Sequence, residues 1–308
     1  MTMSKQPATD KPVAPSSTGT GNGLSIRPHT HVTDNLAEST TAIQPPALIY
    51  VSKRRYIYLG RNQLRIRDLH SAASSLLVCL EGSIRFRSPG DHHWIGAKSV
   101  LIPAGSRISI ENNGGVMSAC YLDAATPDFQ LLKKKMESVA AGIYYNLTNE
   151  DQMATGLSRL REEAPNFSEA QRRVELLIGE CCDDAGASTD PRIAHVIKRL
   201  RDTAALNLSV KTLAEEVGLS ESGLIRLFST HIGAPLRRHR LWYRLVEFVT
   251  LTLSGVPTAM AIKRSGFTDA SHLSRCYSGF FGVSFSYAFS KNTNARYIIE
   301  APEHNSSQ

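Results

Sequence analysis

The feature that most constrains the fold is a ten-residue pattern that occurs twice near the end of the chain. Leu224 to Gly233 reads LIRLFSTHIG, and Leu273 to Gly282 reads LSRCYSGFFG, forty-nine residues later. Both copies follow the pattern L-x-R-x-[FY]-x4-G. A repeated pattern indicates one structural unit used more than once. We therefore expect two copies of the same short motif in the C-terminal third of the chain.

Helical geometry gives each copy two different faces. At about 100° per residue, Leu224 and Phe228 share an apolar face, and Arg226 lies roughly 200° round the helix from Leu224. Arg275 stands in the same relation to the apolar residues of the second copy. Small residues beside each arginine would let the helix backbone approach base edges, and arginine binds guanine bidentately. One copy alone would suggest an ordinary surface helix, but two copies in register favour binding.

Each copy is preceded by a short helical segment and a glycine. SVKTLAEEVGLSES comes before the first copy, and VPTAMAIKRSGFTDAS leads into the second. A short helix, a glycine turn and a second helix form the helix-turn-helix layout. The residues expected to cap these helices or form their turns are Ser209, Gly218, Ser220, Pro257, Gly266 and either Thr268 or Asp269. Residues 234–255 predict a helix that links the two units.

The positive charge of the chain is concentrated around the repeat. The chain has 35 Lys and Arg against 28 Asp and Glu, a net charge of +7. Residues 188–292 contain 14 of the basic and 7 of the acidic residues, so the whole excess lies there. A basic module of this kind is typical of polyanion binding.

Residues of about 190–290 resemble the DNA-binding domain of the AraC/XylS family of bacterial transcription regulators. The stretches LAEEVGLSESGLIRLF, RLWYRLVEFVTLTLSG and GFTDASHLSRCYSGFFGVSFSYA occur in the order and spacing of that family. The resemblance covers about a third of the chain. It implies two helix-turn-helix motifs, at 211–232 and 259–282, bridged by one long helix. Phe285 stands where the family commonly has proline.

The resemblance also implies which side chains contact DNA. The base-reading residues would be Ser222, Ile225, Arg226, Ala270, Ser271, Ser274 and Arg275. Phosphate contacts are expected from Arg237, Arg238 and Arg240, which lie with Arg244 near the start of the linking helix. The side chains of Gly223 and Ile225 offer no hydrogen bonds to bases. We therefore expect specificity to depend mainly on the second unit.

The first part of the chain predicts short strands followed by helices. From ALIYV to about Asp123 the apolar period is near two, and turn residues separate the runs, as in a sandwich or small barrel. DFQLLKKKMESVAAGI and EAQRRVELLIGECCDDAG predict helices, with Asp128 and Ser168 as N-caps and Gly186 as a stop. The family resemblance implies a cupin-like barrel that binds a small effector, and helices that dimerise.

A catalytic or metal-binding role is not expected for this region. A metal-binding cupin brings about three histidines and one carboxylate to one ion. The nearest candidates are His70, His92, His93 and Glu81. Adjacent residues on a strand point to opposite faces, so His92 and His93 would not share an ion. We expect no enzyme activity, no metal and no cofactor.

The sequence leaves the role of the barrel open between two possibilities. In the first, its interior binds a small molecule that gates the regulator, and Arg85, Trp94 and Tyr121 are candidate lining residues. In the second, it only dimerises or binds a partner protein. Core or surface roles explain those three residues equally well.

The predicted architecture is an α+β chain of two domains. It comprises a disordered arm at 1–45, a cupin-like sensor and dimerisation domain at 46–187, a DNA-binding domain at 188–292 and a tail at 293–308. The expected partners are double-stranded DNA, RNA polymerase and a second copy of the chain, with activation favoured by the family resemblance. The sequence lacks an apolar run of membrane-span length, a secretory signal and a disulfide framework, so a cytoplasmic chain is expected.

Overall fold

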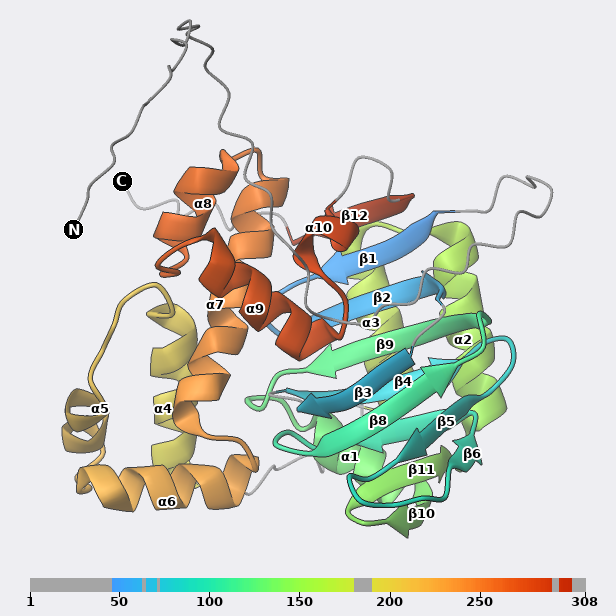
Figure 1. Cartoon of the computed structure of the whole chain (residues 1–308), viewed down its shortest axis with the longest axis horizontal. Helices are drawn as coiled ribbons and strands as arrows, with labels where there is room; N and C mark the ends of the chain where they lie inside the picture. The colour runs from blue at the N-terminus through green and yellow to red at the C-terminus, as the bar shows by residue number, and fades with distance from the viewer. Residues whose placement is uncertain (1–45, 63–64, 71–72, 180–189, 290–293, 301–308) are drawn as a thin grey trace, which may run out of the picture. The chain divides into compact units, whose positions relative to one another are not determined.

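Two β-sheets face each other, built from strands of the first half of the protein and one strand near its C-terminus (Figure 1). The computed structural model describes residues 46–62, 65–70, 73–179, 190–289 and 294–300. The larger sheet has the order β10-β11-β7-β4-β9-β2-β1-β12. Its strands are β1 (Ala47–Val51), β2 (Arg55–Arg61), β4 (Ser74–Cys79), β7 (Ser99–Ile102), β9 (Val116–Leu122), β10 (Met136–Ala140), β11 (Ile143–Leu147) and β12 (Ala295–Ile299). The smaller sheet has the order β3-β8-β5-β6, with β3 (Arg65–His70), β5 (Ile84–Arg87), β6 (Ile95–Ala97) and β8 (Arg107–Asn112).

The larger sheet is covered on both faces, which explains the nearly unbroken apolar run of β4. Leu76 and Val78 pack with the helices that follow the strands. Leu77 and Cys79 point the other way and pack against the smaller sheet. This alternation is the one that the period of two predicts. The prediction of an α+β fold with an N-terminal cupin-like sheet domain and a C-terminal helical domain is confirmed.

Three helices cover one face of the larger sheet: α1 (Asp128–Lys134), α2 (Glu150–Glu163) and α3 (Phe167–Ile178). The predicted helix over 128–143 is wrong in its second half, because β10 and β11 form a hairpin there. Ala141 and Gly142 make its turn, with φ of +46° and +80°. The predicted N-caps are also displaced. Pro127 occupies the cap position before Asp128, and Asn166 caps α3 by accepting a hydrogen bond from the Glu169 amide.

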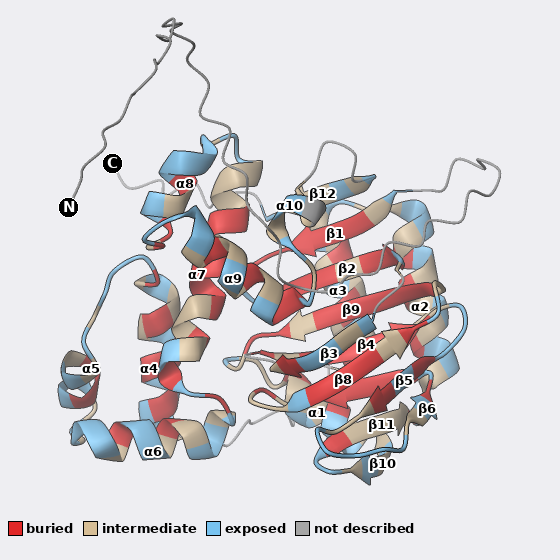
Figure 2. Ribbon diagram, viewed as in Figure 1, coloured by how far each residue is buried: buried red, intermediate tan, exposed pale blue. Residues whose placement is uncertain are grey.

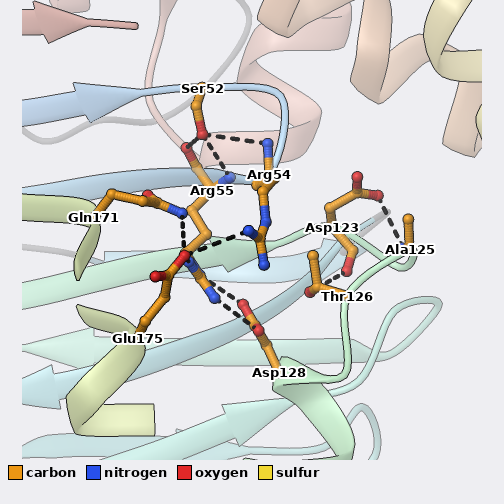
Figure 3. A network of polar contacts seen from close by, with 9 residues as sticks. All are labelled: Ser52, Arg54, Arg55, Asp123, Ala125, Thr126, Asp128, Gln171 and Glu175. Atoms are coloured by element: carbon orange, nitrogen blue, oxygen red, sulfur yellow. Dashed lines mark hydrogen bonds and ion pairs between the residues drawn. The ribbon is translucent and has the colours of Figure 1, made fainter. Parts of the chain in front are cut away.

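A buried ion pair joins β2 to the start of α1 (Figure 3). The Arg55 guanidinium donates to both carboxylate oxygens of Asp128, at 2.6 and 2.8 Å, and both side chains are fully buried. Glu175 on α3 lies 3.4 Å from the same guanidinium. Asp128 therefore serves as an internal counter-ion, and this role displaces it from the cap position.

The region from Pro191 to Ala288 is helical, and its helices pack against the larger sheet. Its helices are α4 (Pro191–Asp202), α5 (Val210–Glu216), α6 (Glu221–Ile232), α7 (Leu236–Leu253), α8 (Thr258–Arg264), α9 (Ala270–Phe281) and α10 (Phe285–Ala288). Aromatic rings join the two halves. Tyr56 and Tyr121 on the sheet lie 5.0 Å, centroid to centroid, from Phe281, and Tyr121 lies 5.6 Å from Trp242. The described residues from Pro46 onward accordingly form one compact unit.

A buried carboxylate adds a polar contact between the halves. Asp123, at the end of β9, accepts a 2.5 Å hydrogen bond from the Tyr243 hydroxyl of α7. The Arg201 guanidinium of α4 lies 3.6 Å from its other oxygen. Burial raises the pKa of Asp123, while the hydrogen bond from Tyr243 acts in the opposite direction.

The C-terminal segment contains a strand that the sequence did not predict. β12 pairs in parallel with β1, from Ala47 opposite Ala295 to Val51 opposite Ile299. It lies within the predicted tail of 293–308. The predicted arm of 1–45, Gly186 and the final residues 301–308 lie outside the described part of the chain.

Candidate nucleic-acid interface

Two helix-turn-helix units stand on either side of α7. In the first, α5 leads through Gly218 into α6, and in the second, α8 leads through Gly266 into α9. Both glycines have positive φ, +67° and +83°, as helix-ending turns require. The predicted caps Ser209, Ser220 and Asp269 each accept a hydrogen bond from a backbone amide three residues on, at 3.0, 3.1 and 2.7 Å. Residues close together in the sequence therefore supply both the glycine turn and the helix caps of each unit.

The two second helices, α6 and α9, each bury one face and expose the other (Figure 2). Leu224 and Phe228 are fully buried, and their counterparts Leu273 and Tyr277 are 1% and 2% exposed. Arg226 and Arg275 are exposed. The arrangement predicted from the repeat, with the apolar residues buried and the arginine exposed on each helix, is therefore confirmed.

The proposed base-reading residues lie on the exposed faces of these helices. Exposed positions are Ser222, Ile225, Arg226, Ala270, Ser271 and Arg275, and Ser274 is half-buried. Ile225 is a large apolar side chain with an exposed fraction of 48%. A Cβ on Gly223 would lie 3.0 Å from the Ser220 hydroxyl oxygen, so the glycine leaves room for that cap.

The arginines near the start of α7 lie in different environments. Arg237 is exposed. Arg238 is half-buried: its guanidinium donates to the His70 carbonyl of β3, approaches the His70 ring at 3.2 Å and lies over the Phe280 ring. Arg240 is half-buried, and burial lowers the pKa of its guanidinium. Arg244 is buried and donates to the Ala204 carbonyl at 2.8 Å, which is a contact inside the helical region. Of the three predicted phosphate contacts, Arg237 is exposed, whereas Arg238 and Arg240 are half-buried.

The candidate metal ligands of the sheet domain are not brought together. His92 and His93 are exposed beside the turn at Gly90, while His70 contacts Arg238. Within the described ranges, no three His, Cys, Asp or Glu side chains are placed to hold a metal ion. The helices described here also include none that is long and apolar enough to cross a membrane.

Comparison with known proteins identifies the helical region. Residues 213–290 match a family model described as a helix-turn-helix domain. These residues contain most of α5 and all of α6 to α10. A search of curated protein sequences found no match to the chain.

Solved structures share the whole two-domain arrangement at low sequence identity. ToxT from Vibrio cholerae O395 is 12% identical, with a TM-score of 0.50 over 76% of this chain and 96% of ToxT. ToxT bound to (E)-4-(8-methylnaphthalen-1-yl)but-3-enoic acid is also 12% identical, with a TM-score of 0.51 over 76% and 97%. The C-terminal part of this chain is therefore a DNA-binding helix-turn-helix domain of the AraC type, joined to a cupin-like sheet domain in the two-domain fold of ToxT.

Proposed function

We propose that this protein is a cytoplasmic transcription regulator that binds specific duplex DNA, contacts RNA polymerase as an activator and acts as a dimer rather than as an enzyme. The observation that supports it most is the matched pair of exposed arginines, Arg226 and Arg275, on two helices of the same motif. Each helix has its apolar face buried, so its opposite face is free to enter a major groove.

DNA binding by the full chain is expected to weaken steeply as salt rises. Each phosphate that the protein neutralises adds about 0.9 to the steepness with which log affinity falls against log salt. Arg237→Ala should lower that slope by roughly one unit and weaken specific and non-specific DNA alike. Titration of labelled duplexes at several salt concentrations measures both. A slope near zero for the wild-type chain would refute DNA binding, and an unchanged slope in Arg237→Ala would remove Arg237 from the interface.

Control by a small molecule is the proposed role of the sheet domain. Its support is the ToxT structure of the same fold that holds a carboxylic acid. The alternative is a domain that only dimerises or binds a partner protein. In favour of the alternative, the described side chains between the two sheets are closely buried, among them Phe86, Ile102, Ile108 and Met117 at 1% exposure or less.

A thermal-shift screen of the full chain against small metabolites separates these two roles. A ligand that binds only the folded protein stabilises it by ~2.7 kcal/mol at a hundredfold excess over its Kd. Gating predicts at least one stabiliser that also changes DNA affinity. Stabilisers that leave DNA affinity unchanged, or none across a broad library, would favour the dimerisation or partner role. Sedimentation of the full chain at micromolar concentration tests the dimer separately.

A further inference from the structure

The outer face of the smaller sheet is rich in arginine. Strand alternation turns Ile84 and Phe86 inward, where both are buried, and turns Arg85 and Arg87 outward. The neighbouring strands β3 and β8 do the same with their own arginines. We call this surface the arginine face; its basic residues are Arg65, Arg67, Arg85, Arg87 and Arg107.

The strand register places these arginines in adjoining rows. Arg65 and Arg85 both lie opposite Glu111, one on each side, and Arg85 forms a 2.7 Å ion pair with it. Arg107 forms an ion pair with Asp68, donating from Nε at 2.9 Å. In the part of the chain that the structure describes, no carboxylate pairs with Arg65, Arg67 or Arg87. The strands therefore place five arginines and two carboxylates on this face, a net excess of three positive charges.

An aromatic ring supports two of these arginines. The guanidinium carbons of Arg87 and Arg85 lie 4.7 and 5.7 Å from the centre of the Trp94 ring. Such stacking helps to hold both guanidinium groups in place, and Arg87 also donates to the Asp91 carbonyl at 3.3 Å. Arginine held in this way is well suited to phosphate, which accepts its parallel hydrogen bonds.

The arginine face adjoins the helix-turn-helix region through β3 (Figure 1). Gly282, at the end of α9, lies against the side chain of Ile66, which points to the inner side of β3, opposite to Arg65 and Arg67. His70, opposite Arg107 in the sheet, contacts Arg238 of α7. Arg238 of α7 and Arg107 of β8 therefore both lie next to His70, on different sides of it.

The composition of the face favours DNA over an acidic protein. Protein interfaces have an apolar core within a polar rim. The exposed large hydrophobic side chains in the described ranges, which include Val139, Leu176 and Met260, all lie outside the strands of the smaller sheet. A surface of arginines with one stacked tryptophan matches the charge of a phosphate backbone.

We propose that the arginine face is a second contact surface for duplex DNA, binding phosphates of the DNA that flanks the site held by α6 and α9. This proposal rests on the proposed function, because the flanks are defined by that site. Contacts to phosphate add affinity and fix the position of the protein but carry no sequence information. The sheet domain would then lengthen the DNA footprint without changing the sequence preference.

The test compares two duplexes and two triple variants of the full chain. The short duplex contains only the selected binding site, and the long duplex extends it by ~20 base pairs on each side, roughly 70 Å per flank at ~3.4 Å per base pair. The test variant is Arg65→Gln, Arg67→Gln and Arg87→Gln together. The matched control is Lys133→Gln, Lys134→Gln and Arg159→Gln, which removes three charges from α1 and α2 on the opposite side of the larger sheet. Thermal melting checks that each variant folds.

On the long duplex, the test variant should bind about tenfold or more weakly, with a salt slope smaller by roughly 2–3 units. It should bind the short duplex like the wild type, and the control should match the wild type on both. The fluorescence of Trp94, obtained as the difference between the wild type and Trp94→Phe, should change on binding of the long duplex only. Wild-type affinity of the test variant for the long duplex, or equal losses on both duplexes, would overturn the proposal. Normal DNA binding with a loss only of polymerase-dependent transcription would instead identify an acidic protein as the partner.

Failure of the arginine face to bind DNA can be distinguished from failure of the proposed function. If the wild-type chain binds no duplex specifically, the proposed function fails in the short-duplex arm. A long duplex of unrelated sequence at low salt still tests the arginine face in that case. A loss in the test variant relative to the control supports a DNA-binding sheet surface, and no loss overturns it.

Discussion

Replacing both exposed arginines of the recognition helices, Arg226→Ala with Arg275→Ala, is expected to abolish most of the sequence preference of the full chain. Each bidentate contact to a base contributes ~1–3 kcal/mol of discrimination, and separated positions add, which gives ~2–6 kcal/mol together. Specific affinity should therefore fall by between roughly 30-fold and 10⁴-fold. Competition binding over a library of duplex sites measures the loss and shows which base pairs lose their preference.

A control with equal charge separates base reading from general attraction. Lys263→Ala with Arg264→Ala removes two exposed charges from α8, which precedes the recognition helix. This pair should weaken all sequences alike. The single variants should differ, with Arg275→Ala relaxing one base pair more strongly than Arg226→Ala does. If Arg275→Ala weakens every sequence equally, α9 does not read bases, and Arg226 must provide specificity despite the neighbouring Gly223 and Ile225.

Asp128→Ala is expected to destabilise the protein by ~3–5 kcal/mol, because the Arg55 guanidinium would stay buried without its bidentate counter-ion. Glu175, at 3.4 Å and partly exposed, offers only partial compensation. Urea unfolding of the full chain, with the m-value checked, measures the change in the free energy of unfolding.

Two further variants test whether burial is the cause. Asp202→Ala removes the partner of Lys198 in an exposed pair at 2.8 Å and should cost less than about 1 kcal/mol. Arg55→Met combined with Asp128→Leu removes both buried charges and should recover most of the stability that Asp128→Ala removes. If Asp128→Ala and Asp202→Ala lower the free energy of unfolding by similar amounts, burial does not make the Arg55–Asp128 pair more important for stability.

The recognition units were predictable because local interactions determine them. A serine or aspartate accepts the amide three residues on, a glycine takes positive φ, and apolar residues recur once per helical turn. Ser220, Gly218 and Leu224 are all within one such stretch, so the sequence alone indicates the turn and the buried face. The repeat then identifies Arg226 and Arg275 as equivalent, and the structure confirms that both are exposed.

The wrongly predicted segments are those whose structure depends on pairing with other strands. MESVA at 136–140 has a helix-compatible composition, but its backbone hydrogen bonds go to β11, and tertiary context overrides such weak preferences. β12 exists because its backbone pairs with β1, about 250 residues earlier in the sequence. Contacts of this range leave no periodic signal in the segment itself.

Charge shows the same division between sequence and structure. Residue counts and the repeat are enough to show that residues 188–292 are basic and that their two arginine-bearing helices are equivalent. The rest of the chain has equal numbers of basic and acidic residues, so its net charge gives no sign of the arginine face. Only the tertiary structure placed Arg65, Arg85 and Arg107 on one side of a sheet, and only it placed Arg238 against His70. A sum of charges along the sequence ignores direction, whereas strand alternation and register sort side chains by the face to which they point.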